Sequence, residues 1–309
     1  MSGNEKIISE ENKSKKTGSL LNRLKQNENL YYAFTNPKVL FGLTLFLLVC
    51  LFAVIGPRFT DFHVDQAAGP GFPAELARPS AEYPFGLTYP YGYDVFTQTV
   101  YGLRATIMAG FIGGLLASFI GLIVGLIAGY KGGMLDEFLM GVTNVFLTFP
   151  QLAILIVVAS YFEYRGIISM AILVGLVIWP WTARAVRAQA LSLKNEEHVD
   201  LSRISSNSTF RILIEDIAAN MFSYIFMVFI IQFMGTIMVT VGLEFLGLGP
   251  TRGVSLGLVM HYALNTGALY LGYWWWGIIP GAFIMLMVFA LYNINNGLDE
   301  VFNPQLREM

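Results

Sequence analysis

Residues 195–220 read NEEHVDLSRISSNSTFRILIEDIAAN, a polar and charged stretch that lies between two long apolar runs. The 309-residue chain around it is 55% hydrophobic and only 13% charged, with a mean hydropathy of +0.58. Soluble domains carry about 25% charged residues, so this composition predicts a polytopic membrane protein. The question is then why two membrane spans should be joined by such a polar segment.

Six apolar runs are long enough to cross a bilayer as helices, which takes about 20 residues each. If the chain starts inside, most of its 19 lysines and arginines fall on the cytoplasmic side. The positive-inside rule therefore predicts that both termini and the polar segment are cytoplasmic. The expected spans are Val39–Pro57, Ala105–Tyr130, Phe138–Phe162, Gly166–Ala183, Ile217–Leu243 and Tyr273–Tyr292.

These spans suggest a division of the chain into five regions. They are a basic cytoplasmic tail (1–38), a first anchor (39–57), an extracytoplasmic segment (58–102), a core of five spans (103–298) and a C-terminal cytoplasmic tail (299–309).

Three features outside the spans carry further expectations. A short helix is expected near Tyr93–Tyr101, and Gly253–Gly272 is expected to be a surface or re-entrant segment. Tyr273 and the three tryptophans after it are expected to form an aromatic belt at the outer membrane interface.

Small residues recur every four positions in the second span and would let helix backbones approach closely. The neighbour is either another helix of the same bundle or a partner subunit. In the third and fourth spans, Pro150 and Pro180 each remove a helix hydrogen bond and are expected to kink or break the helix. The small-residue stripe consists of Gly113, Ala117, Gly121, Gly125 and Gly129.

The polar segment is predicted to form two helices joined by a turn. The first, Leu193–Ile204, would continue the fourth span. In the turn, Asn207 tolerates a left-handed backbone and Ser208 can cap the second helix. Such a structure suits docking of another protein, and a solvated loop is the alternative. The second helix would present an apolar face made of Phe210, Leu213, Ile214, Ile217, Ala218 and Met221.

Five stretches, in the right order, resemble ABC-importer inner-membrane permeases of the dipeptide, oligopeptide and nickel branch, and specifically the C-type subunit. WPWTARAVRAQALSLKNEEHV at residues 179–199 matches the family pattern W-x-x-x-A-R-x-V-R-x-Q-x-L-S-L-K-x-x-x-x-V. The other four are YPFGLTYPYGYDVFTQTVYGLR (83–104), EFLGLG (244–249), YWWWGIIPG (273–281) and GLDEVFNPQL (297–306). The resemblance covers about residues 35–306. It implies an all-α type I importer permease fold, with six spans and a cytoplasmic coupling helix between spans four and five.

The resemblance also implies the activity and the partners. In the bacterial cytoplasmic membrane, the chain would form a peptide pathway with a second permease subunit. Two ATP-binding subunits would drive it, and an extracytoplasmic binding protein would deliver the substrate. The residues that the resemblance implies for ATPase coupling are Glu197, His198, Asp200, Leu201, Arg203, Ser206, Asn207, Ser208 and Arg211.

The chain itself is expected to be neither an enzyme nor a cofactor protein. No G-x-x-x-x-G-K-[ST] motif occurs in it, so ATP and Mg²⁺ would be bound by the partner ATPases. The three histidines are far apart and Cys50 is the single cysteine, which argues against a metal site. Nothing in the sequence suggests a nucleic-acid partner.

The coupling segment departs from the family pattern at several places. The family's Glu-Ala-Ala is Asp200-Leu201-Ser202 here, its glycine is Ser206, and its proline is Ala219. We expect Asn207 to take over the turn that the glycine makes, and we expect weaker coupling through this subunit than through its partner.

Four residues are candidates for the substrate pathway. Gln232, Thr236 and Thr240 lie on the fifth span, and interhelical hydrogen bonding is the alternative role for them. Pro150 is the fourth candidate, because kinks at membrane depth often lie near a pathway. Glu244, near the outer end of the fifth span, is expected to be solvated.

Two other functions remain open from the sequence. An ion-coupled secondary transporter would need internal inverted repeats and carboxylates at the bilayer midplane, and the spans show neither. A non-transporting anchor or regulator with a degenerate coupling motif is the second alternative. ATP turnover that depends on this subunit would separate the importer from both.

Overall fold

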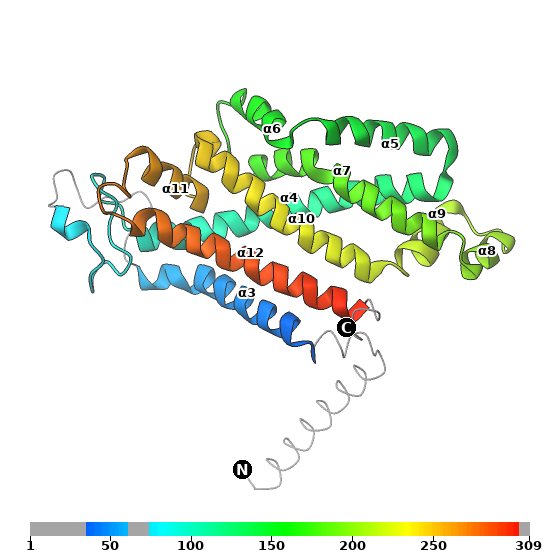
Figure 1. Ribbon diagram of the computed structural model, residues 1–309, viewed down its shortest axis with the longest axis horizontal. Coiled ribbons are helices and arrows are strands. Elements are labelled where there is room, and N and C mark those ends of the chain that lie inside the picture. Colours follow the sequence, from blue (N-terminus) through cyan, green and yellow to red (C-terminus); the bar gives the residue numbers. More distant parts are fainter. Residues whose placement is uncertain (1–34, 61–73, 303–309) are drawn as a thin grey trace, which may run out of the picture.

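The computed structural model describes residues 35–60 and 74–302. Its described parts form a bundle of long helices that run roughly along one axis (Figure 1). Five helices are long and apolar enough to cross a membrane, which confirms the all-α membrane fold. They are α3 (Pro37–Ile55, extended by the 3₁₀ turn η1, Gly56–Phe59), α4 (Val95–Lys131), α7 (Ile167–Leu193), α10 (Phe222–Leu243, extended by the π-helical turn η4, Glu244–Leu248) and α12 (Trp275–Phe302).

The expected third span is not one continuous helix. It consists of α5 (Gly133–Thr148) and α6 (Gln151–Ser160), which are bent by 80° at the break between them. Pro150 has no N–H to donate, and it forces Phe149 into an extended conformation (φ −84°, ψ 141°). The structure thus has six spans only if this broken pair counts as one.

Pro180 is expected to kink or break its helix, and the structure has no break there. α7 continues through Pro180 to Leu193 as a single helix. Its neighbours on the helix, Trp179 and Thr182, are buried against other helices. Packing therefore holds α7 together at a position where the sequence favours a break.

The glycine stripe of α4 lies against α7 within the same chain. A Cβ atom built on Gly125 would come within 2.6 Å of the Ala183 carbonyl oxygen, and one on Gly129 within 2.7 Å of the Ala190 Cβ. No larger side chain fits between these backbones. The stripe therefore packs against another helix of the same chain, which is the first of the two predicted alternatives.

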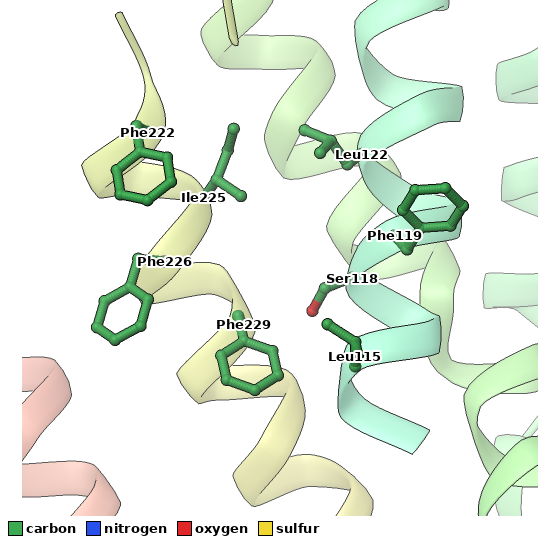
Figure 2. A pocket seen from close by; sticks show the side chains of 8 residues that line it. All are labelled: Leu115, Ser118, Phe119, Leu122, Phe222, Ile225, Phe226 and Phe229. Carbon is green, nitrogen blue, oxygen red and sulfur yellow. The ribbon is translucent and has the colours of Figure 1, made fainter. Parts of the chain in front are cut away.

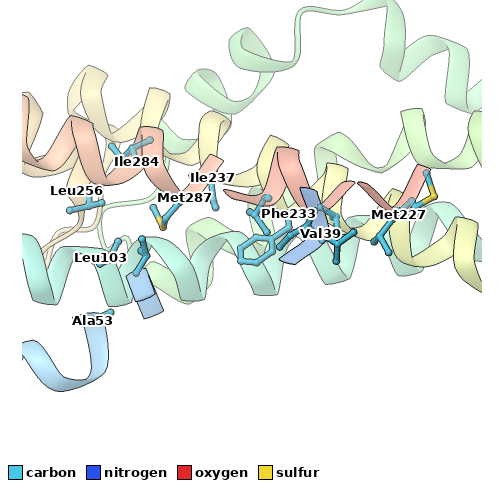
Figure 3. Close-up of a cluster of buried hydrophobic side chains, with 14 residues drawn as sticks. Val39, Ala53, Leu103, Met227, Phe233, Ile237, Leu256, Ile284 and Met287 are labelled. Carbon is cyan, nitrogen blue, oxygen red and sulfur yellow. The ribbon is translucent and has the colours of Figure 1, made fainter. Parts of the chain in front are cut away.

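A large apolar core lies where α3, α4, α10 and α12 meet. Figure 3 shows Phe233 and Ile237 of α10 among side chains from the other three helices, including Leu103 of α4 and Met287 of α12. α3 lies alongside α12, so closely that a Cβ on Gly42 would be 2.6 Å from the Ala290 carbonyl oxygen. A second cluster joins α4, α6, α7 and α10.

The segment before α4 and the helix α11 (Leu256–Asn265) lie together at one end of the bundle (Figure 1). α4 starts at Val95, where Asp94 caps it. The short helix expected at Tyr93–Tyr101 is therefore the beginning of α4, and the boundary expected between residues 102 and 103 falls inside it.

The aromatic belt expected at this end is only partly correct. Trp274 is exposed, but Trp275 and Trp276 are buried in a cluster with Leu87 and Val95. The Trp275 indole Nε1 donates a hydrogen bond to the Leu87 carbonyl oxygen at 3.1 Å. These two tryptophans therefore anchor the segment before α4 to the start of α12.

Part of the predicted organisation lies outside the described residues. This applies to residues 1–34 of the basic tail, residues 61–73 of the extracytoplasmic segment and residues 303–309 of the C-terminal tail. The last residues of the basic tail are described, and Pro37 and Lys38 begin α3. Asn36 caps this helix, and its Nδ2 atom also donates to Glu300 of α12 at 3.2 Å.

Candidate functional site

The polar segment is folded as two short helices at the end of the bundle opposite α11 (Figure 1). α7 ends at Leu193, and α8 (Glu197–Ile204) begins after a turn. The predicted continuous helix Leu193–Ile204 is therefore interrupted. After a second turn come α9 (Thr209–Arg211) and the π-helical turn η3 (Ile212–Ala218), which leads into α10.

The turn between α8 and α9 depends on Ser206 and Ser208. Ser206 has a left-handed backbone with φ 58°, whereas we expected Asn207 to adopt it. This is the position at which the family pattern has glycine, the residue that adopts φ > 0 without steric cost. The Ser208 hydroxyl accepts a hydrogen bond from the Arg211 N–H at 3.3 Å, so the predicted cap is confirmed.

The apolar face predicted for the second helix is shifted. Ile217 and Met221 are buried as expected, but Phe210 and Ile214 are exposed, and Ile212 is buried in their place. The cause is the π-helical turn, in which the Ala219 N–H bonds to the Ile214 carbonyl, five residues back. Because this turn has more than the 3.6 residues per turn of an α-helix, Ile214 no longer lies on the buried face.

One residue of α8 is fully buried. Val199 packs into an apolar cluster that draws side chains from three other elements. Leu126 comes from α4, Val186 and Ala190 come from α7, and Ile212 and Ile217 come from η3. α8 thus packs against the bundle through Val199.

Other apolar side chains of the segment face outward. Leu201 is 58% exposed, Ile204 79% and Phe210 75%. We call these three residues the exposed apolar face. Three large apolar side chains that are exposed within one short polar segment favour an interaction site over a solvated loop.

Most of the charged residues predicted for coupling are exposed. They include Glu197, Asp200 and Arg211, and Arg211 Nε pairs with Glu215 Oε2 of its own helix turn at 2.6 Å. His198 and Arg203 are exposed as well, and they also contact neighbouring elements of the chain. Contact with the Tyr130 side chain raises the pKa of the Arg203 guanidinium above its ordinary value, so this group stays charged at any physiological pH.

The pathway candidates of α10 are buried inside the chain. Gln232 Nε2 donates to Thr182 Oγ1 at 2.5 Å and to the Ile178 carbonyl at 3.2 Å, both on α7. Thr236 donates to the Gln232 carbonyl at 2.7 Å, and Thr240 is also buried. For Gln232 the interhelical alternative is the one observed. Pro150 lies exposed at the break between α5 and α6.

Glu244 is not solvated, contrary to expectation. It is 2% exposed and lies at the N-terminal end of α11, against the Ser255 hydroxyl and the Gly257 backbone. A carboxylate at this end of a helix faces the unpaired N–H groups and the positive end of the helix dipole. Glu244 thus lies between the end of α10 and the start of α11, a position that the sequence does not reveal.

The sequence also gave no sign of two surface pockets. One, of about 260 Å³, is an apolar groove between α4 and α10, where phenylalanines face Leu115, Leu122 and the Ser118 hydroxyl (Figure 2). The other, of about 330 Å³, lies near α11 and is walled by Tyr91, Tyr262 and Trp276. Within residues 35–60 and 74–302, no three His, Cys, Asp or Glu side chains are grouped to hold a metal ion.

The geometry defines a multi-pass membrane protein that presents a short helix–turn–helix at one end of its bundle. The chain belongs to the binding-protein-dependent transport system inner membrane components, a family whose profile matches residues 121–308. Members of this family have the type I importer permease fold, so the fold implied by the sequence resemblance is confirmed.

Similar proteins align with nearly the whole length of this chain. The dipeptide transport system permease protein DppC of Bacillus subtilis is 32% identical over 88% of this chain and 83% of its own length. The oligopeptide transport system permease protein OppC of the same organism is 29% identical, over 89% of this chain and 88% of its own. OppC of Escherichia coli is 28% identical, over 86% of both chains.

Proposed function

We propose that this chain is a permease subunit of an ATP-driven peptide importer in the bacterial cytoplasmic membrane, with both termini cytoplasmic. It would form the peptide pathway with a second permease subunit. An extracytoplasmic binding protein would deliver the peptide, and two ATPase subunits would supply energy. The family membership and the peptide permeases that the chain resembles support the substrate class.

The observation that carries the proposal is the exposed apolar face of Leu201, Ile204 and Phe210. The chain has no phosphate-binding loop of its own, so energy from ATP would enter through contact with another protein. A docked ATPase would bury the apolar face, and the exposed charges of Glu197, Asp200 and Arg211 would surround it as a polar rim.

The mechanism follows from a two-state equilibrium. Closure of the ATPases on ATP and Mg²⁺ can drive the permease from one state to the other only if the docking contacts differ between the states. The helix–turn–helix is suited to this task, because short turns connect it to α7 on one side and to α10 on the other.

The broken third span is the surface that we assign to the second permease and the pathway. Among the side chains of α5, only Thr143 is buried. Asn144 and Thr148 are exposed, and polar side chains in a membrane segment normally face protein or water rather than lipid. The break at Pro150 lies on this same surface.

The first test is co-purification. The tagged chain would be expressed with its chromosomal neighbours, extracted in mild detergent, and its partners identified. We expect a second permease and one or two P-loop ATPases. Leu201→Asp should abolish ATPase recovery. Leu271→Asp, a change at a similarly exposed leucine near α11, should not.

Transport by the reconstituted complex separates the alternatives. An importer takes up peptide with ATP alone. Uptake that follows an ion gradient without ATPases would establish the secondary transporter. A complex that forms but neither transports peptide nor alters ATP turnover would establish the anchor or regulator.

A further inference from the structure

α8 is tied to the membrane helices by two groups of polar contacts, one on each side of Val199. We call them the Arg203 clasp (Arg203, Tyr130 and Lys194) and the His198 clasp (His198, Asn220 and Asp216). In both, a side chain of α8 contacts another part of the chain. They connect α8 to different helices of the bundle.

The Arg203 clasp joins α8 to the ends of α4 and α7. The guanidinium NH2 donates to the carbonyl of Lys194, the C-cap residue of α7, at 3.0 Å. Its Cζ lies 5.4 Å from the ring centroid of Tyr130, in the last turn of α4. Its NH1 donates to Asp200 Oδ1 at 2.7 Å, which orients the guanidinium. A planar fork of donors that also stacks on an aromatic ring is a property of arginine that lysine lacks.

The His198 clasp joins α8 to the segment before α10. His198 Nε2 lies 3.1 Å from Asn220 Nδ2 and 3.3 Å from the Asp216 carbonyl oxygen. The Asn220 amide also donates to that carbonyl at 2.6 Å. When Nε2 is unprotonated it accepts from Asn220, and when it carries a proton it donates to Asp216, so either tautomer keeps a contact.

The two clasps fix the orientation of α8 relative to the membrane helices. Val199 is the one buried residue of α8, so apolar packing alone would hold this helix at a single point. A force applied at Leu201 and Ile204 would then turn α8 about Val199 rather than move the bundle. Contacts at positions 198 and 203 prevent that rotation and pass the force on to α4, α7 and α10.

We therefore propose that Arg203 and His198 are positioning residues, which transmit movement from a docked ATPase to the membrane helices through their contacts with the ends of those helices. This inference rests on the proposed function. The sequence predicted a single set of coupling residues. This inference divides that set into residues that dock the ATPase and residues that transmit its movement.

The test is the number of peptides transported per ATP hydrolysed in the reconstituted complex. Arg203→Ala should lower this ratio about tenfold, the effect of losing one charge-assisted contact. ATPase recovery should stay unchanged. Arg203→Lys should give an intermediate ratio, because a cation remains near the Tyr130 ring. Lys131→Ala is the matched control: it removes an exposed cation next to Tyr130, and the ratio should not change.

Two results would overturn the inference. Arg203→Ala could lose the ATPase during purification, which would make Arg203 a docking residue, or it could keep the wild-type ratio. If Arg203→Ala does not fold, Tyr130→Leu removes the other half of the clasp and should lower the ratio in the same way. If the wild-type chain co-purifies with no ATPase at all, the proposed function itself is refuted. That result differs from the two results for Arg203→Ala described above.

Discussion

Arg187 of α7 and Asp136 of α5 form a two-pronged ion pair, with Nε 2.5 Å from Oδ1 and NH2 2.6 Å from Oδ2. Asp136 is the better buried of the two, its side chain being 14% exposed. Next along the same helices, Arg184 donates to Asn144 Oδ1 at 2.7 Å. These polar contacts add to the apolar contact that Met140 and Phe146 of α5 make with the cluster between α4 and α7, and together they fix the position of α5 on the bundle.

Arg187→Met should destabilise the isolated subunit by about 2 kcal/mol, because Asp136 is left half-buried without a partner. The measurement is the fraction of the chain that stays monodisperse in detergent after heating. Arg187→Met combined with Asp136→Leu should recover part of the loss, since no unpaired charge remains. If the double variant is no more stable than the single one, the unpaired carboxylate is not the cause.

Gly125→Val should destabilise the subunit by about 1–3 kcal/mol, as overpacking of a tight interface does. The added Cβ would lie 2.6 Å from the Ala183 carbonyl oxygen, a backbone atom that cannot move aside. Gly141→Ala is the control, because a Cβ there meets nothing within 4 Å. Equal heat resistance of the two variants would contradict the close packing of α4 on α7.

Ser206→Gly should stabilise the turn between α8 and α9 by about 1 kcal/mol, because glycine adopts the observed φ of 58° without steric cost. Ser206→Val should destabilise it, since a β-branched residue is disfavoured there. Hydrogen exchange of residues 199–212 reports on this turn directly. Slower exchange in Ser206→Val than in Ser206→Gly would show that the backbone is not left-handed.

Gly257→Ala should destabilise the contact between α11 and the end of α10. The new Cβ would lie 2.6 Å from Glu244 Oε2 and 2.9 Å from the Val241 carbonyl oxygen, and the expected loss is about 2 kcal/mol. Gly277→Ala is the matched control, because the nearest atom to its Cβ would be 3.7 Å away. Thermal stability in detergent distinguishes them, and the prediction requires that only the first variant loses stability.

Trp275→Phe should loosen the segment before α4, because it removes the hydrogen bond to the Leu87 carbonyl, worth about 1 kcal/mol. Limited proteolysis between Arg78 and Asp94 should become faster. Trp274→Phe changes an exposed tryptophan next to it and should leave the rate of cleavage unaltered.

Much of the fold could be predicted from the sequence because its signals are local. Runs of apolar residues identified the membrane helices, Pro150 identified a break, and Ser208 identified a helix cap. The position of the polar segment between two spans indicated a helix–turn–helix outside the membrane. Each of these depends on neighbours along the chain, or on the contrast between lipid and water, and needs no knowledge of which helices pack together.

Only the tertiary structure decided how these elements are used. Pro180 lies in an unbroken helix and Glu244 is buried, because packing outweighs local preference at both positions. The π-helical turn moved Ile214 off the buried face, and the helix ends at Tyr130, Lys194 and Asn220 turned Arg203 and His198 toward the bundle. These outcomes depend on residues far apart in the chain that meet only when the helices pack, so no pattern within one segment contains them.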